Sequence, residues 1–151
     1  MMNFITKSEA QTRKLGRNLG KNLSCGDILA LMGELGSGKT VLVKGIAQGL
    51  GISSRWVNSP SFVLIREYPA KINLYHFDLY RLDSLEEIEA LGWEEYLNKG
   101  VLVIEWADKL KGILPKEYLL IELEILSEKE RRIRLIPKGK RYKELLKKLR
   151  L

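Results

Sequence analysis

Residues 33–40 read Gly-Glu-Leu-Gly-Ser-Gly-Lys-Thr and match the pattern G-x-x-x-x-G-K-[ST] at every position. Glycines permit positive φ and let the backbone approach an anion closely, and the successive N–H groups of such a loop point toward a bound phosphate. The helix that follows adds the partial positive charge of its N-terminus. At these positions Lys39 would reach the β- and γ-phosphates, and the Thr40 hydroxyl would ligate Mg²⁺. The stretch therefore predicts a P-loop that binds a nucleoside triphosphate with Mg²⁺.

The segments on either side of the loop have the patterns that this mechanism requires. The apolar run at 27–32 has the length and the boundaries of a buried strand. A helical pattern then runs from about Lys39 to Leu50, with Gly49 and Gly51 at its end. This context supports the motif, whose chance match in a chain of this composition is on the order of one per cent. The predicted phosphate-binding set is Gly33, Leu35, Gly36, Ser37, Gly38, Lys39, Thr40 and, through its backbone N–H only, Val41.

The rest of the chain alternates between strand-like and helix-like patterns. Residues 6–9, Thr-Lys-Ser-Glu, have the form of a capping box, and leucines recur at helical spacing over 15–23. Two β-rich runs, 62–68 and 72–79, flank a turn at 69–71 and are expected to pair as an antiparallel hairpin. Further elements are expected as a helix at about 83–92, one or two helical turns at 93–98, strands at 101–104, 118–126 and 131–136, and a basic amphipathic helix at about 140–151.

Length and composition agree with one domain. A chain of 151 residues with 45% hydrophobic residues can bury one core and is too short for two ordinary domains. We therefore predict a single α/β domain of the P-loop NTPase type over residues 1–151, with a central mixed, mostly parallel sheet flanked by helices and an antiparallel hairpin. No run approaches the ~18 uninterrupted apolar residues of a membrane span, and the first ten residues lack the pattern of a secretory signal. With a single cysteine, these features predict a cytoplasmic protein without membrane contact.

Two carboxylates are candidates for the acid that takes part in hydrolysis of a bound triphosphate. A P-loop enzyme needs an acid that organises Mg²⁺ and the attacking water. Glu105 follows the apolar run 101–104, where the C-terminal edge of a parallel strand would bring it beside the phosphates. Asp78 lies late in the run 72–79. Spacing does not decide which of the two acts as a base and which as a metal ligand.

Other residues receive plainer interpretations. The guanine-reading motif N-K-x-D has no match, since residues 98–101 read Asn-Lys-Gly-Val. His76 is expected to be packed or hydrogen-bonded, because the chain has no other histidine and one cysteine to complete a metal site. Arg55, Arg66 and Arg81 could supply a charge-stabilising finger, although surface or partner contacts are the favoured interpretation.

Positive charge is concentrated near the C-terminal end. Residues 129–151 hold eleven Lys and Arg against two Glu, whereas the remainder is near neutral and the chain as a whole carries +7. Two interpretations stay open for this segment: a solvated helix face, or a contact with RNA or with an acidic partner.

Four segments together resemble the TsaE (YjeE) family, the bacterial ATPases of tRNA threonylcarbamoyladenosine synthesis. They are the loop at 33–40, Ser59-Pro60-Ser61-Phe62, His76-Phe77-Asp78-Leu79-Tyr80-Arg81-Leu82, and Ile104-Glu105-Trp106. The resemblance runs from about Thr6 to Pro115, and the HxDxYRL segment is far more specific than the P-loop alone. Glu34, Val41 and Ser61 stand where the family usually has Asp, Thr and Thr.

The resemblance implies ATP and Mg²⁺ as cofactors and slow hydrolysis that supports turnover of a complex with TsaD and TsaB. Those proteins transfer the threonylcarbamoyl group to the adenosine beside the anticodon of tRNA. The resemblance therefore implies that this chain contacts tRNA indirectly, through the complex, and the basic tail is a candidate for a direct contact. By position, the resemblance implies a catalytic set of Lys39, Asp78 and Glu105, with Lys39 on the phosphates, Asp78 orienting the attacking water, and Thr40 and Glu105 as Mg²⁺ ligands. It also implies that Trp106 lies close to the nucleotide and that residues 59–62 form a switch-I-like loop.

Two other functional classes stay open. A small-molecule P-loop kinase would transfer phosphate to an added acceptor, although the chain has little length for an acceptor pocket and a lid. A nucleotide-dependent binding module would need Lys39 but not Asp78 for its cellular function.

Overall fold

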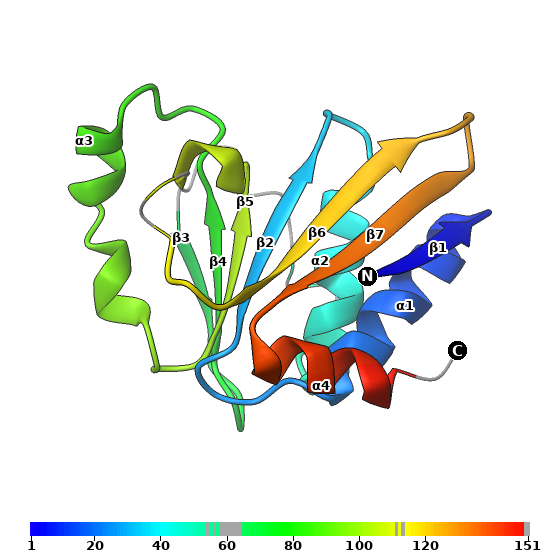
Figure 1. Ribbon diagram of the computed structural model, residues 1–151, viewed down its shortest axis with the longest axis horizontal. Coiled ribbons are helices and arrows are strands. Elements are labelled where there is room, and N and C mark those ends of the chain that lie inside the picture. Colours follow the sequence, from blue (N-terminus) through cyan, green and yellow to red (C-terminus); the bar gives the residue numbers. More distant parts are fainter. Residues whose placement is uncertain (54, 56, 58–64, 111, 113, 150–151) are drawn as a thin grey trace.

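The sheet of the described chain has seven strands in the order β1-β7-β6-β2-β5-β4-β3 (Figure 1). The computed structural model describes residues 1–151 except 54, 56, 58–64, 111, 113 and 150–151. Strands β2, β4, β5 and β6 pair in parallel at the centre, and β1, β3 and β7 extend the sheet through antiparallel pairings. The predicted α/β class with a mixed sheet is therefore confirmed, with the parallel pairings confined to the centre. The strands are β1 (Met2–Thr6), β2 (Ile28–Gly33), β3 (Ile65–Tyr68), β4 (Leu74–Asp78), β5 (Val101–Glu105), β6 (Tyr118–Ile125) and β7 (Arg131–Lys138).

Helices cover both faces of the sheet (Figure 1). They are α1 (Glu9–Lys21), α2 (Lys39–Gly49), α3 (Leu85–Glu89), α4 (Lys140–Lys148) and the 3₁₀ helices η2 (Trp93–Tyr96) and η3 (Ala107–Leu110). Alternate residues of a strand point to opposite faces, so Leu29 and Leu31 of β2 pack in one core with α1, α2 and α4. Ile28 and Ala30 pack in a second core with α3, η2 and η3. The result is a three-layer arrangement in which β2 is buried on both faces.

The predicted hairpin is present. Strands β3 and β4 pair antiparallel from Ile65 opposite Phe77 to Tyr68 opposite Leu74. The predicted strand residues 62–64 lie outside the described residues. The helix expected at 83–92 is shorter, because α3 begins after Ser84, whose hydroxyl accepts the Glu87 N–H at 3.2 Å. None of the helices in the described ranges is long and apolar enough to cross a membrane.

The capping box predicted at Thr6 is wrong by two residues. Thr6 is the last residue of β1 and pairs with Arg131 of β7, so the backbone there is still extended. The N-cap of α1 is Ser8, whose hydroxyl accepts the Gln11 N–H at 3.2 Å. Thr6 instead makes a 2.7 Å hydrogen bond to the hydroxyl of Thr12 within α1. The long-range strand pairing, which the local pattern does not contain, moved the start of the helix.

Helices α1 and α2 approach each other at backbone distance through four glycines. A Cβ atom on Gly16 would lie 2.4 Å from the Leu42 carbonyl oxygen, and one on Gly45 would lie 2.2 Å from the Arg13 carbonyl oxygen. Gly20 and Gly49 are equally crowded against the opposite helix. This contact fixes α2, and with it the loop that precedes α2, against the N-terminal part of the chain.

Candidate functional site

The loop between β2 and α2 has the geometry of an anion-binding turn. Strand β2 ends at Gly33. Gly36 and Gly38 have backbone φ angles of +80° and +100°, which residues other than glycine rarely adopt. Gly38 is the N-cap of α2, so no side chain caps this helix, whereas Ser8 and Ser84 cap α1 and α3. The first N–H groups of a helix have no partner within it. The N-terminus of α2 is therefore a set of donors suited to an anion.

Two of the predicted phosphate-binding residues lie beneath the loop. A Cβ on Gly33 would come within 2.5 Å of the Ser37 hydroxyl and 2.8 Å of the Leu123 carbonyl oxygen, so only glycine fits there. Ser37 is buried, its N–H donates to the Glu34 carbonyl at 3.1 Å, and its hydroxyl has no hydrogen-bond partner among the described residues. These residues therefore shape the loop from below.

Lys39 is held in a partly apolar position. Its ammonium donates to the Gly33 carbonyl and lies 3.6 Å from the centre of the Trp106 ring, a cation–π contact. The residue is 6% exposed. Burial lowers the pKa of Lys39, and the carboxylates of Glu105, Asp78 and Asp108 partly oppose this shift. Trp106 itself has a positive φ of 61° directly after β5, which turns its ring toward the loop.

The two candidate carboxylates are neighbours on adjacent parallel strands. Asp78 ends β4 and lies opposite Glu105, which ends β5, so the strand register alone brings the two predicted acids together. Both are buried, and Asp78 accepts the Tyr80 N–H at 3.0 Å. Burial raises the pKa of Asp78, the Tyr80 N–H opposes this, and the charge of Glu105 raises it further. Glu105 makes a 2.5 Å hydrogen bond to Nε2 of His76, so His76 is packed and hydrogen-bonded as expected.

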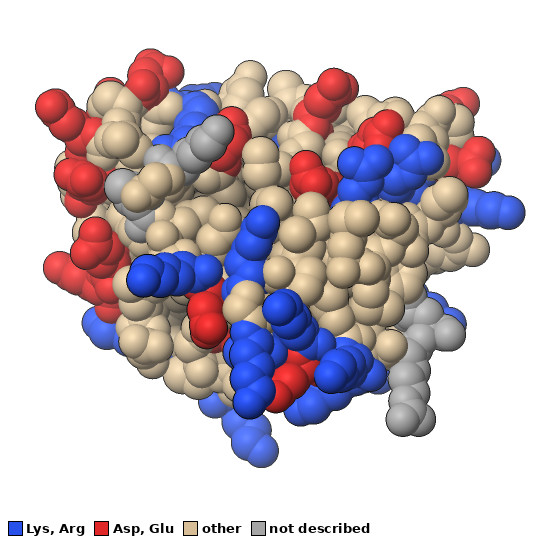
Figure 2. Space-filling model, in the orientation of Figure 1, with Lys and Arg blue, Asp and Glu red and all other residues tan. Residues whose placement is uncertain are grey.

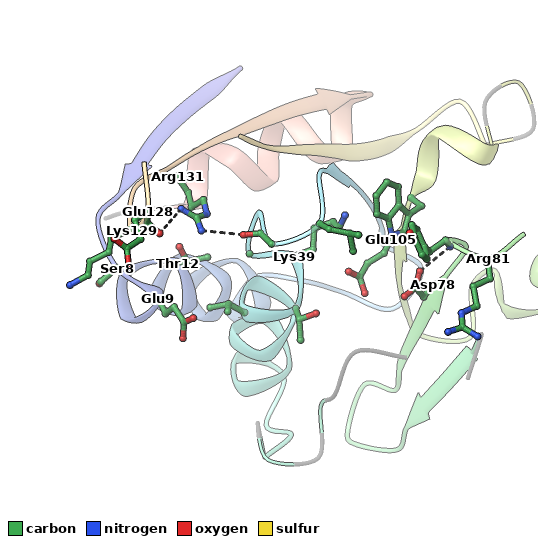
Figure 3. Close-up of a pocket in the computed structure, with 17 residues that line it drawn as sticks. Ser8, Glu9, Thr12, Lys39, Asp78, Arg81, Glu105, Glu128, Lys129 and Arg131 are labelled. Carbon is green, nitrogen blue, oxygen red and sulfur yellow. Dashed lines mark hydrogen bonds between the residues drawn. The ribbon is translucent and has the colours of Figure 1, made fainter. Parts of the chain in front are cut away.

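A cavity of about 670 Å³ brings these groups into one space. Every predicted site residue lines it except Gly33 and Ser37, and Arg81 is the member of the arginine set that lines it. Figure 3 shows Asp78, Glu105 and Arg81 on one side of the loop. The predicted switch-I-like loop at 59–62 lies outside the described residues.

The opposite wall of the cavity was not predicted from the sequence. It is formed by the start of α1 and by the turn between β6 and β7 (Figure 3). Arg131 joins this wall to the P-loop, because its guanidinium donates to the Gly36 carbonyl at 3.1 Å and to the Ser127 carbonyl at 2.8 Å. No local motif marks these residues, since β-pairing over long sequence separations brings them to the site. The missed lining residues of this wall are Ser8, Glu9, Thr12, Glu128, Lys129 and Arg131; Tyr80, beside Asp78 on the other side, was also missed.

Comparison with known proteins assigns the chain to a family. The family model described as "Threonylcarbamoyl adenosine biosynthesis protein TsaE" matches residues 6–133. The chain belongs to the TsaE family. The relative in Bacillus subtilis (strain 168) is 40% identical over 150 residues, which cover 98% of this chain and 93% of the relative. The relative in Treponema pallidum (strain Nichols) is 38% identical over 133 residues, which cover 87% and 98%. Both are called "tRNA threonylcarbamoyladenosine biosynthesis protein TsaE".

A solved structure shares the fold of this TsaE chain. The crystal structure of Bacillus subtilis YdiB superposes with a TM-score of 0.83 at 33% sequence identity, covering 98% of this chain and 93% of that one. The resemblance inferred from four short segments therefore extends over nearly the whole fold.

The donor set of this TsaE chain fits a phosphate anion together with a hard divalent cation. The uncapped start of α2 and the ammonium of Lys39 supply positive charge, while Thr40 and Glu105 offer oxygen atoms in the same cavity. Mg²⁺ prefers oxygen ligands and usually keeps several waters alongside one or two carboxylates and substrate phosphates. Within the described residues, no group of three or more His, Cys, Asp and Glu could hold a metal unaided. The arrangement suits a cation that arrives with a polyphosphate.

Proposed function

We propose that this TsaE chain binds ATP with Mg²⁺ in the P-loop cavity and hydrolyses it as the ATPase component of tRNA threonylcarbamoyladenosine modification, in a cytoplasmic complex with TsaD and TsaB. The names of its relatives support the modification pathway. The observation that carries the ATPase proposal is the single cavity that joins the uncapped start of α2, Lys39, and the adjacent carboxylates of Asp78 and Glu105.

Each residue has a distinct role in the proposal. The N–H groups at the start of α2 and the ammonium of Lys39 bind the phosphates, and Thr40 and Glu105 ligate Mg²⁺. Bound Mg²⁺ would neutralise charge that develops on the phosphates. Asp78 accepts a hydrogen bond from the attacking water and orients it for in-line displacement. Trp106 already contacts Lys39 and would adjoin the phosphates when ATP is bound.

The decisive experiment is an ATPase assay of the purified chain with and without purified TsaD–TsaB. We expect slow hydrolysis alone and a marked stimulation by the partner proteins. Lys39→Ala should weaken ATP binding, because the phosphates lose their main cationic partner. Lys14→Ala, on the exposed side of α1, is the matched control and should bind ATP normally. Wild-type protein that neither binds nor hydrolyses ATP would refute the proposal.

The same assay separates the alternatives. Phosphate transferred to a small acceptor in place of water would identify a kinase. ATP binding without hydrolysis in any combination of partners, together with a functional Asp78→Ala variant in cells, would identify a nucleotide-dependent binding module.

A further inference from the structure

His76 is fully buried beside Glu105 and outside the residues that line the cavity, and the chemistry proposed above gives it no role. Successive residues of a strand alternate between faces, so His76 and Asp78 of β4 share the face that carries α1 and α2. Tyr75 and Phe77, between and beside them, belong to the core on the other face. His76 pairs with Val103 in the β4–β5 register, which places it two residues before the Asp78–Glu105 pair on the same face.

The contact with Glu105 is short and shielded from water. Nε2 of His76 lies 2.5 Å from Oε2 of Glu105, and the two residues are 0% and 3% exposed. A hydrogen bond to a carboxylate in such surroundings is stronger than one in water. It restricts the rotation of the Glu105 side chain, since one of its two oxygens has a fixed partner.

The other ring nitrogen identifies the donor in this bond. Nδ1 of His76 is buried and has no hydrogen-bond partner among the described residues. If Nδ1 carried the proton, a buried N–H donor would be left unpaired, which is costly and rare in proteins. With the proton on Nε2, only a lone pair on Nδ1 is left unpaired, and the bond to Glu105 is complete. The structure therefore favours the tautomer in which Nε2–H donates to Glu105.

We propose that His76 is a positioning residue: its Nε2–H fixes one oxygen of Glu105 and so orients the other toward the P-loop cavity as a ligand for the cation that accompanies the nucleotide. The inference rests on the proposed function of Glu105. A carboxylate that is free to rotate would have to be ordered each time the cation binds. Partners that orient a ligating carboxylate typically contribute roughly 10- to 100-fold to metal affinity.

The first test measures the tautomer in the free protein, without nucleotide or metal. Long-range ¹H–¹⁵N NMR spectra of ¹⁵N-labelled protein report which nitrogen of its one histidine carries the proton. We expect it on Nε2. A proton on Nδ1 alone, with Nε2 unprotonated, would overturn the inference, because Nε2 could then not donate to Glu105. This result does not depend on whether the protein hydrolyses ATP.

The second test measures the binding of a fluorescent ATP analogue in EDTA and across a Mg²⁺ titration. We expect His76→Leu to leave binding in EDTA unchanged and to raise the half-saturating Mg²⁺ concentration by roughly tenfold or more. His76→Gln retains an N–H donor of similar reach and should restore most of the Mg²⁺ affinity. Tyr75→Phe removes a polar atom from the adjacent β4 residue on the other face and serves as the matched control.

The outcomes distinguish this inference from the proposed function. Equal weakening in EDTA and in Mg²⁺, or an unchanged Mg²⁺ requirement, would overturn the positioning role. Wild-type protein that binds no nucleotide would refute the proposed function and this role with it. If His76→Leu fails to fold, as its thermal unfolding curve would reveal, the His76→Gln variant and the tautomer measurement decide.

Discussion

Lys39 occupies a position that is unfavourable for a charged group unless an anion joins it. It lies at the positive end of the α2 dipole, where negatively charged groups are normally stabilising, and the first turn of α2 holds no acidic residue. Burial lowers its pKa, and its ammonium contacts only uncharged partners, the Gly33 carbonyl and the Trp106 ring, in these two interactions. Ionisable groups whose pKa is shifted in this way cluster at functional sites. A phosphate group would stabilise the charged ammonium, because the anion pairs with both the ammonium and the helix.

Asp78 makes the stability of the protein depend on pH. Its pKa is raised mainly by burial, so the folded state holds the proton more tightly than the unfolded chain does. Stability is therefore lost as the pH rises from the ordinary aspartate pKa through the raised one. Asp78→Asn removes this loss, so we expect a higher melting temperature than wild type at neutral pH and little difference under acidic conditions below both pKa values. Hydrolysis should fall by roughly 100-fold or more.

Thermal unfolding at several pH values checks this prediction, with the exposed Asp83→Asn as control. An Asp78→Asn variant that is less stable than wild type at neutral pH would show that the ionised carboxylate stabilises the fold.

The sequence predicts the P-loop and the two carboxylates of this site, but it does not predict the residues of the opposite wall of the cavity. The loop, Asp78 and Glu105 were identified because a local motif or the end of an apolar run marks each of them. Arg131 was not, because its bond to Gly36 joins positions 95 residues apart. The position of Thr6 was misjudged for the same reason, since its backbone belongs to a strand that pairs with β7.

Helix α2 is positioned by its packing against α1, and this packing should tolerate no side chain at Gly45. Alanine is better than glycine by about 1 kcal/mol in a helix interior. However, a Cβ would lie 2.2 Å from the Arg13 carbonyl oxygen, a backbone atom that cannot rotate away. Overpacking typically costs ~1–3 kcal/mol, so we expect Gly45→Ala to destabilise the protein by about 2 kcal/mol. Urea unfolding measures this. Lys14→Ala on the exposed side of α1 should change stability by less than about 0.5 kcal/mol.

Helix α4 is tied to the amino end of the central strands by Arg141. Its guanidinium donates to both carboxylate oxygens of Asp27, at 3.0 and 2.7 Å, and Asp27 is 4% exposed. Tyr142 accepts the Ile28 N–H at 2.8 Å, and burial raises the pKa of Tyr142 to about 12. Arg141→Met would leave the buried carboxylate with the Ser24 N–H as its remaining described partner. We expect a loss of about 2 kcal/mol in the free energy of unfolding.

Urea unfolding of the Asp27→Asn, Arg141→Met double variant is the control for that prediction. It should recover part of the loss, because the neutral amide no longer needs a charged partner. A single variant as stable as wild type would mean that water replaces the guanidinium without cost.

The sequence predicts helices and strands correctly where the hydrophobic periodicity is strong. It fails where an element forms only by pairing with a strand far away in the sequence. Strands β2 and β5, the β3–β4 hairpin and helix α2 follow from apolar runs and turn residues. Strand β1 is not among the strands predicted from the sequence, because its five residues become a strand through pairing with β7. The close contact of α1 with α2 depends on glycines in both helices, and neither helix alone reveals it.

Across the whole molecule, the P-loop cavity and the basic helix lie at opposite ends of β2. The P-loop follows Gly33 at the carboxyl end of the strand, whereas Tyr142 of α4 binds the N–H of Ile28 at the amino end. Lys and Arg side chains gather in Figure 2 over the region where Figure 1 shows α4. Its apolar side packs into the core, so Lys143, Lys147 and Lys148 face outward. The charge of α4 is therefore separate from the P-loop cavity.

This separation predicts that changes to the α4 lysines leave the P-loop cavity unaffected, and we expect these lysines to contact a polyanion. We expect Lys147→Gln with Lys148→Gln to retain wild-type ATP binding and to weaken binding of tRNA. For each tRNA phosphate that the variant no longer neutralises, the slope of log K against log salt should become shallower by about 0.7–0.9. Fluorescence anisotropy with labelled tRNA at several salt concentrations measures both quantities.

Lys71→Gln with Lys99→Gln, which removes the same charge from exposed positions outside α4, is the matched control. If both pairs change the affinity and the slope equally, only the net charge of the protein matters. If neither pair changes them, the basic side of α4 is simply a solvated helix surface.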